Sequence, residues 1–171
     1  MIEEEKKHVI AILVDNEFGA LARIVELFSA RGYNIESLNV APINQEKKIS
    51  RITITTYGTS KTIDLICKLL NRIVPVHRAV ELTREEGYIE RELALVKVIG
   101  EEEKRKKALE IADKYRTSVV DITGNSIVFE IIGTTKAVDE VLHKLEPLGL
   151  DGVSRTGAAA GYKGEKKLST S

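Results

Sequence analysis

The feature that most constrains the fold of this chain is the order in which strand-like and helix-like patterns of apolar residues follow one another. An apolar strand at Val9–Val14 precedes a helical stripe with one predicted buried face, made of Leu21, Ile24, Val25 and Phe28. The full order is strand, helix, strand, strand, helix, strand, and it occurs once on each side of the charged stretch 84–91. The pattern therefore predicts an α+β protein with two successive ferredoxin-like β-α-β-β-α-β domains.

The first domain is expected to span residues 1–83. Its remaining strands are predicted at 35–43, 49–57 and 76–83. Gly32 can take the left-handed conformation that ends the first helix. Thr59 or Ser60 is the expected N-cap of the second helix, and Pro75 is expected to end it.

The second domain is expected at 92–160, after a linker at 84–91. Its predicted strands are 93–99, 119–123, 127–132 and 150–155, and its predicted helices are 101–115 and one that Thr134 or Thr135 caps. Gly124-Asn125 indicates a tight turn between two of these strands. The polar stretch 161–171 is predicted to be a mobile tail.

Each predicted sheet carries helices on one face, so its other face needs a cover. The strands bear Ile, Val and Leu on both sides, which indicates that another copy of the chain supplies the cover. A homo-oligomer is therefore expected.

Composition excludes several classes of function. Lys plus Arg and Asp plus Glu both number 26, so no charge bias points to nucleic acid or a membrane surface. The N-terminus lacks the apolar core of a signal peptide, and a cytoplasmic location is expected. The three histidines share no metal-ligand spacing with Cys67, and no catalytic motif is present. No metal site and no catalytic residue are predicted.

The same order of elements also occurs in RNA-binding modules, which stack bases on aromatic residues of their central strands. Here the corresponding strand 49–57 has one aromatic residue, Tyr57, at its edge. The neutral net charge also disfavours RNA binding.

The start of the first helix is the candidate binding site. A helix N-terminus exposes unpaired N–H groups at the positive end of the helix dipole, and Gly19 would let a carboxylate approach that backbone closely. A purely structural interpretation competes with this one. In it Asn16 caps the helix, Gly19 relaxes its first turn and Asn34 is a turn residue.

Several of these segments resemble a known family. The segments are Asn16-Glu17-Phe18-Gly19-Ala20-Leu21, Arg31-Gly32-Tyr33-Asn34-Ile35-Glu36-Ser37-Leu38, Glu90-Arg91-Glu92-Leu93-Ala94-Leu95 and Arg155-Thr156-Gly157. They are similar to the regulatory (small) subunit of acetolactate synthase, and the resemblance spans nearly the whole chain. It implies that the first domain is an ACT domain, a module that binds amino acids.

The resemblance also implies a function in the biosynthesis of valine, isoleucine and the other branched-chain amino acids. The chain would be a dimeric, non-catalytic subunit that stimulates a separate catalytic (large) subunit and confers feedback inhibition by valine. Thiamine diphosphate, magnesium and FAD would belong to that partner. The effector-binding residues carried over from the family are Asn16, Gly19, Ala20, Leu21, Asn34 and Ile35. Phe18 departs from the small residue or proline common at its position.

Within the resemblance, Asn16 would contact the amino-acid head group, and the backbone N–H groups of Gly19 to Leu21 would receive the carboxylate. Asn34 and Ile35 of the facing protomer would bind the ammonium end of valine and line the pocket for its isopropyl group. The residues leave open whether leucine or isoleucine also binds. They also leave open the alternative of a free-standing amino-acid sensor with no enzyme partner.

Overall fold

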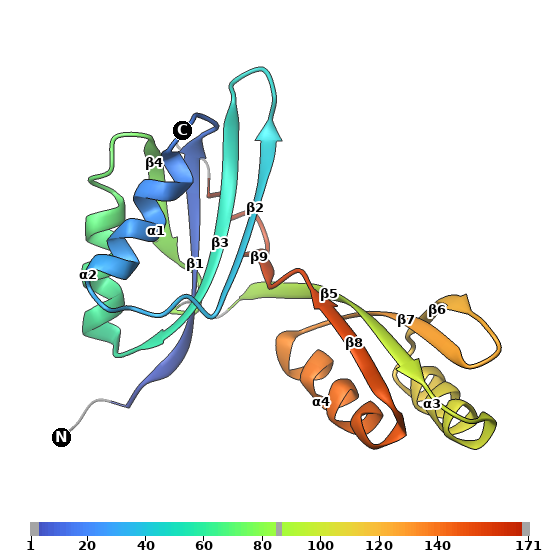
Figure 1. The fold of residues 1–171 in the computed structure, drawn as a ribbon. Helices are drawn as coiled ribbons and strands as arrows, with labels where there is room; N and C mark the ends of the chain where they lie inside the picture. The colour runs from blue at the N-terminus through green and yellow to red at the C-terminus, as the bar shows by residue number, and fades with distance from the viewer. Residues whose placement is uncertain (1–3, 85–86, 169–171) are drawn as a thin grey trace. The chain divides into compact units, whose positions relative to one another are not determined.

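The computed structural model describes residues 4–84 and 87–168, which form two compact units. Of the described residues, 4–84, 87–89 and 158–168 belong to one unit, and 90–157 belong to the other. Each unit is an antiparallel sheet with two helices on one face (Figure 1). The predicted α+β fold with two β-α-β-β-α-β units is confirmed. Among the described residues, no helix is long and apolar enough to cross a membrane.

The first unit has its elements in the predicted order: β1 (Lys6–Asp15), α1 (Ala20–Ala30), β2 (Ser37–Asn44), β3 (Ile49–Gly58), α2 (Ser60–Leu70) and β4 (Val76–Glu81). The strands lie in the order β2-β3-β1-β4. Ile10 pairs with Ile54 and Ile12 with Ile52, and all four side chains are buried in the core that the helices cover. Alternation along each strand places these residues on one face, which explains the position of the core.

The ends of the helices in the first unit follow from local hydrogen bonds. Thr59 is the N-cap of α2, and its side-chain oxygen accepts from the N–H of Thr62. The prediction that α2 extends to Pro75 is wrong, because the helix ends at Leu70. Its C-cap Asn71 donates from Nδ2 to the carbonyls of Cys67 and Ala79, both at 2.8 Å. These bonds fasten the end of α2 to β4.

The second unit repeats the plan with β5 (Tyr88–Ile99), α3 (Glu102–Lys114), β6 (Ser118–Ile122), β7 (Ser126–Gly133), α4 (Thr135–Leu145), the short 3-10 helix η1 (Glu146–Leu148) and β8 (Leu150–Arg155). Its strand order is β6-β7-β5-β8. Thr134 caps α4 by accepting from the N–H of Ala137. The strand β5 begins at Tyr88, so residues 88–91 of the expected linker belong to a strand, and residues 85–86 lie outside the described residues.

The C-terminal segment differs from the sequence-based expectation. Instead of leaving the molecule as a polar tail, residues 158–168 pack on the face of the first sheet that the helices leave open. They include a short strand, β9 (Ala159–Tyr162). Leu168 is 7% exposed and packs in a cluster with Val9, Ala11, Leu13 and Leu82. Residues 169–171 of the expected tail lie outside the described residues.

This packing corrects a second expectation. A second copy of the chain is the predicted cover for the open face of the sheet. In the first unit, however, the C-terminal segment of the same chain covers Val9, Ala11, Leu13 and Leu82 on that face. Arg51 on β3 donates a hydrogen bond to the carbonyl of Ala160, which ties the segment to the sheet. Partial burial lowers the pKa of the Arg51 guanidinium, with an opposing effect from Tyr162.

Candidate functional site

The candidate site is built on the loop between β1 and α1. Main-chain hydrogen bonds hold both sides of this loop: Asp15 N–H donates to Pro75 O at 2.9 Å and Asn16 N–H donates to Lys48 O at 2.6 Å. The loop is therefore fixed to the start of β4 and to the β2–β3 hairpin. The side chain of Asn16 remains exposed.

Gly19 determines how the helix begins. It is the N-cap of α1 and adopts φ +81° and ψ −9°, a left-handed conformation that glycine adopts without strain. No side chain caps the helix. Ala20 N–H lies 3.4 Å from Glu17 O and Arg23 N–H donates to Gly19 O at 3.0 Å. Within the described residues, no protein acceptor is seen for the N–H groups of Leu21 and Ala22.

The structure does not support the interpretation in which the Asn16 side chain caps α1. An N-cap side chain accepts from the second or third helical N–H group, and Asn16 lies three residues before the N-cap and does not do so. Open space also surrounds the position that a Cβ atom would take on Gly19, with nothing within 4 Å. The first turn is thus an uncapped, accessible cluster of N–H groups with no acidic side chain in it.

The predicted buried face of α1 was partly wrong. Ile24 and Phe28 are buried as expected, but Leu21 is 37% exposed and Val25 is 38% exposed. The buried stripe instead consists of Ala20, Ile24, Leu27 and Phe28. These positions have an equally good helical spacing, so periodicity alone could not choose between the two faces. Phe18, which departs from the small residue or proline common at its position in the family, is fully exposed beside the helix start.

Asn34 and Ile35 lie beyond the other end of α1. Gly32 closes the helix with φ +68°, as predicted, and the Asn34 carbonyl accepts from Oγ1 of Thr56 at 2.6 Å. The Asn34 side chain donates to Glu36 Oε2 at 3.2 Å on the surface. Ile35 is half-buried against the core.

A single chain does not bring the six predicted site residues together. Asn16, Gly19, Ala20 and Leu21 gather at the start of α1, whereas Asn34 and Ile35 follow its end. The helix has 11 residues, which corresponds to a length of about 16 Å. One amino acid could not touch both groups within one protomer.

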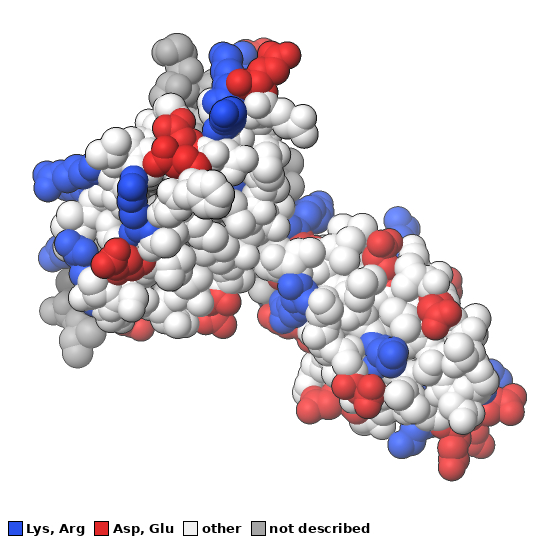
Figure 2. Space-filling model, turned by 45° about the horizontal axis from the view of Figure 1, so that its top comes forward, with Lys and Arg blue, Asp and Glu red and all other residues white. Residues whose placement is uncertain are grey.

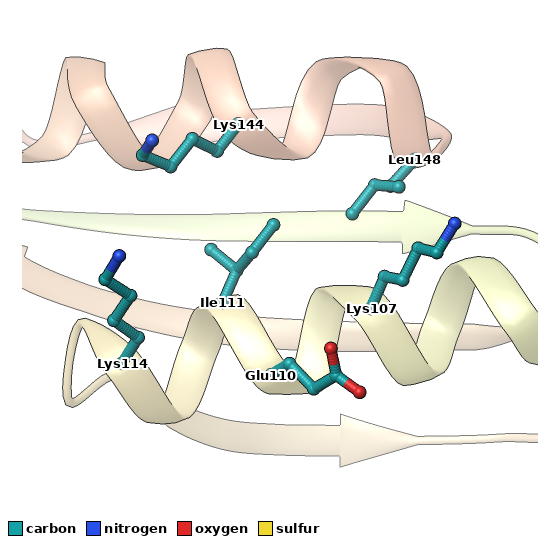
Figure 3. Close-up of a pocket in the computed structure, with 6 residues that line it drawn as sticks. All are labelled: Lys107, Glu110, Ile111, Lys114, Lys144 and Leu148. Atoms are coloured by element: carbon teal, nitrogen blue, oxygen red, sulfur yellow. The ribbon is translucent and has the colours of Figure 1, made fainter.

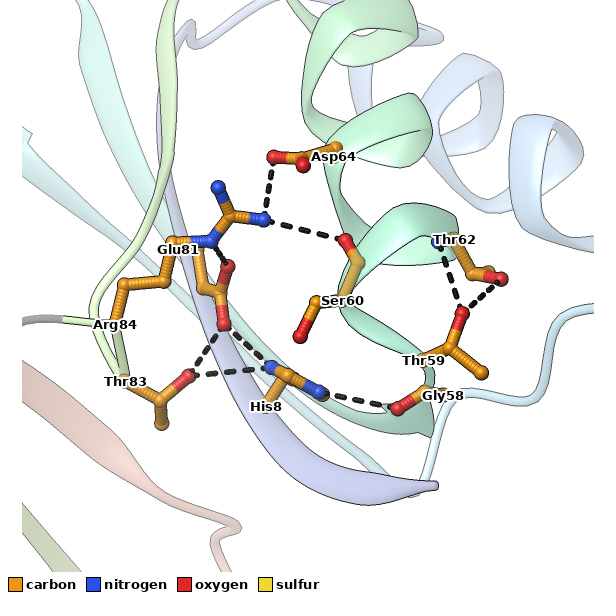
Figure 4. Close-up of polar contacts among 9 residues, drawn as sticks. All are labelled: His8, Gly58, Thr59, Ser60, Thr62, Asp64, Glu81, Thr83 and Arg84. Carbon is orange, nitrogen blue, oxygen red and sulfur yellow. Dashed lines mark hydrogen bonds and ion pairs between the residues drawn. The ribbon is translucent and has the colours of Figure 1, made fainter. Parts of the chain in front are cut away.

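A second polar cluster in the first unit was considered as an alternative site (Figure 4). His8 contacts the buried carboxylate of Glu81 through Nδ1, and its Nε2 lies 3.1 Å from Gly58 O. Arg84 contacts Glu81 and Asp64. Because these groups satisfy one another, we assign the cluster a structural function.

Charge and metal-ligand chemistry add no other site. On the face drawn in Figure 2, Lys and Arg side chains are interspersed with Asp and Glu. Over residues 4–84 and 87–168, no group of three or more His, Cys, Asp or Glu side chains is placed to hold a metal ion.

Comparisons with known proteins place these residues in a family. A family model described as "AHAS small subunit-like ACT domain" matches residues 10–78, and one described as "Small subunit of acetolactate synthase" matches residues 91–164. A probable acetolactate synthase small subunit of Archaeoglobus fulgidus is 36% identical over 161 residues, which cover 94% of this chain and 99% of that protein. The chain belongs to the acetolactate synthase small-subunit family.

Other small subunits agree with this assignment. That of Haemophilus influenzae is 37% identical over 163 residues, covering 95% of this chain and 99% of the relative. The crystal structure of the small subunit from Thermotoga maritima superimposes with a TM-score of 0.84 at 28% identity, over 94% of this chain and 99% of that one. The resemblance stated from the sequence is confirmed. All six candidate residues lie within the part matched by the ACT-domain model.

Proposed function

We propose that this regulatory small subunit has no catalytic activity of its own, stimulates a catalytic subunit that depends on thiamine diphosphate, and confers feedback inhibition by valine. Thiamine diphosphate, magnesium and FAD would be held by the catalytic subunit. The proposal combines the family of the chain with one structural observation, the uncapped helix start at Gly19. A carboxylate is the group that such a helix start binds best, since N–H donors and the dipole favour a negative charge there.

In this proposal the effector site lies between two copies of the chain. A two-fold axis beside α1 would bring the start of one α1 next to the end of the other, which is where Asn34 lies. Two observations support a contact here: Leu21 and Val25 present half-exposed apolar side chains on α1, and β2 is an edge strand of its sheet.

Each candidate residue then has a defined role. The N–H groups of the Gly19–Leu21 segment bind the valine carboxylate, and Asn16 contacts the head group. Asn34 and Ile35 of the second copy bind the ammonium group and wall the apolar side chain. Ala20 is buried and anchors the first turn, so it contributes through its backbone.

Inhibition requires that valine binds one arrangement of the complex more tightly than the other. A coupling free energy of about 1–3 kcal/mol would change the linked affinity by roughly 5–150-fold. A site between two protomers suits this coupling, because a ligand that closes the interface changes how the two copies pack.

Replacement of Gly19 tests the site. Gly19→Asp should abolish valine inhibition and leave stimulation of the catalytic subunit intact, because the new carboxylate repels that of valine. Gly19→Asn is the matched control, since asparagine has the same shape without the charge and both tolerate the left-handed conformation. Calorimetry with valine, leucine and isoleucine on the purified chain gives the affinities, and reconstitution with the catalytic subunit gives the inhibition.

The outcomes separate the possible explanations. If valine inhibits the complex that contains Gly19→Asp at the same valine concentration as the wild-type complex, the site is assigned wrongly. Valine binding without any binding of the catalytic subunit in a pull-down would instead support the free-standing sensor.

A further inference from the structure

The second unit contains a hollow that the effector site does not use. It has a volume of about 440 Å³ and lies between α3 and α4, lined by Lys107, Glu110, Ile111, Lys114, Lys144 and Leu148 (Figure 3). All six residues belong to residues 90–157, so the hollow is complete within this unit.

The floor of the hollow is apolar. Ile111 on α3 and Leu148 at the end of η1 point toward each other between the helices in Figure 3. Both are only partly buried where they pack on the core. The floor can therefore bury an additional apolar side chain, which would stabilise a complex by removing this surface from water.

The rim of the hollow is basic. Lys107 and Lys114 are seven residues apart on α3, or two helical turns and about 10 Å along the helix. In Figure 3 the ammonium groups of Lys114 and Lys144 lie at one end of the hollow and that of Lys107 at the other.

These ammonium groups are available for a partner. Among the described residues, none of the three has a carboxylate within ion-pair distance, and the only ring contact is Lys144 at 6.0 Å from the centre of the Tyr115 ring. Glu110 is the one carboxylate in the lining. By contrast, Arg84 and Arg155 of the same chain each contact two carboxylates. The hollow thus combines an apolar floor with an excess of unpaired positive charge.

We propose that an acidic amphipathic helix of the catalytic subunit docks in this hollow, which forms a groove between α3 and α4. The inference rests on the proposed function, because it assigns a contact surface to the second unit of the same regulatory subunit. The fitting helix carries an apolar side chain for the floor and carboxylates about two turns apart, which match the spacing of Lys107 and Lys114. The basic rim favours an acidic occupant and makes the association salt-dependent.

The groove favours a protein segment over a small anion. The three ammonium groups are distributed along the groove instead of converging on one point, as Figure 3 shows. A single phosphate or carboxylate would reach only one end of it. A helix that lies between α3 and α4 would reach both ends and the floor together.

The test is the affinity of the full-length chain for the purified catalytic subunit, measured by surface plasmon resonance at two salt concentrations. Lys107→Glu with Lys114→Glu should weaken binding at least 10-fold and reduce its salt dependence. The control is Lys106→Glu with Lys136→Glu, which changes net charge equally at exposed positions outside the lining and should bind like the wild type. Replacement of Lys107 and Lys114 by Gln is a milder second pair, and melting curves check folding.

A photo-crosslinking residue in place of Glu110 identifies the occupant. The expected crosslink is to an acidic helix of the catalytic subunit. A crosslink to a second copy of this chain, to its own C-terminal segment, or to none would overturn the proposal. If the Glu and the Gln double variants of Lys107 and Lys114 both bind with wild-type affinity, the docking proposal is overturned and the proposed function stands. If the wild-type chain does not bind the catalytic subunit, the docking proposal and the proposed function both fail.

Discussion

Arg155, the last residue of β8, donates a hydrogen bond from Nε to the buried carboxylate of Glu92 on β5. Its Nη1 donates to Asp139 at 2.7 Å, the fifth residue of α4. The first unit has a similar arrangement, in which Arg84 contacts Asp64, the fifth residue of α2. In both units an arginine that follows or ends the last strand thus fastens the second helix to the sheet.

Loss of Arg155 should destabilise the second unit. Glu92 is 4% exposed, and Arg155→Ala leaves its charge buried and unpaired, at a cost of about 3–5 kcal/mol. The hydrogen bond to Glu92 raises the pKa of the Arg155 guanidinium, so the arginine is charged throughout the usable pH range. Urea unfolding measures the loss.

Two variants control this prediction. Arg155→Ala combined with Glu92→Gln should recover part of the stability, because no buried charge remains. Arg23→Ala should cost less than about 1 kcal/mol, since the Arg23–Glu17 pair is exposed and 3.5 Å long. Equal losses for Arg155→Ala and Arg23→Ala would contradict the prediction.

The C-terminal segment should contribute measurably to the stability of the first unit. Leu168→Ala removes a buried side chain from the cluster around Val9, Ala11 and Leu13, at a cost of about 2 kcal/mol. Leu109→Ala on the exposed side of α3 is the matched control and should change the free energy of unfolding by less than about 0.5 kcal/mol.

A chain truncated after Arg155 should also self-associate, which sedimentation would detect, because the outer face of the first sheet becomes exposed.

Cys67 should be unreactive and should make stability depend on pH in alkali. Burial, and to a lesser extent Glu81, raises the pKa of its thiol to about 11 from an ordinary value of 9.0. At pH 8 the fraction of Cys67 present as thiolate should be about 100-fold lower in the folded chain than in the unfolded chain. The rate of alkylation by iodoacetamide should fall by the same factor. Rapid alkylation of the folded chain would refute this.

The sign of the pH effect follows from linkage. Between pH 9 and 11 the unfolded chain loses the Cys67 proton while the folded chain retains it. The free energy of unfolding therefore falls as the pH rises through this window. Comparison with Cys67→Ala isolates the contribution, because other groups titrate there in both proteins; the variant should show a smaller decline.

A site shared between protomers predicts complementation. Gly19→Asp and Asn34→Ala homodimers should each lose valine binding, since both of their sites contain a defect. A heterodimer of the two variants has one site with intact Gly19 and Asn34, and calorimetry should find about half a valine per chain. No recovery in the mixed dimer would indicate that both residues act from the same chain.

The amino-acid sequence by itself determined the order of strands and helices in each unit and the class of fold. Strand alternation, helical spacing and the caps Thr59 and Thr134 are local signals, and each depends on residues a few positions apart. The strand 150–155 was predicted with the bounds that β8 has in the structure. At the start of α1 the residue types left open whether Asn16 caps the helix, and the structure shows that no side chain does.

Only the tertiary structure decided which surfaces are covered. Leu21 and Val25 have the same helical period as the buried stripe, and packing against the sheet placed them outside the core. Leu168 is one apolar residue in a polar stretch, and its partner Val9 lies at the other end of the chain. Such contacts depend on how distant segments meet in space, and local periodicity carries no information about that meeting.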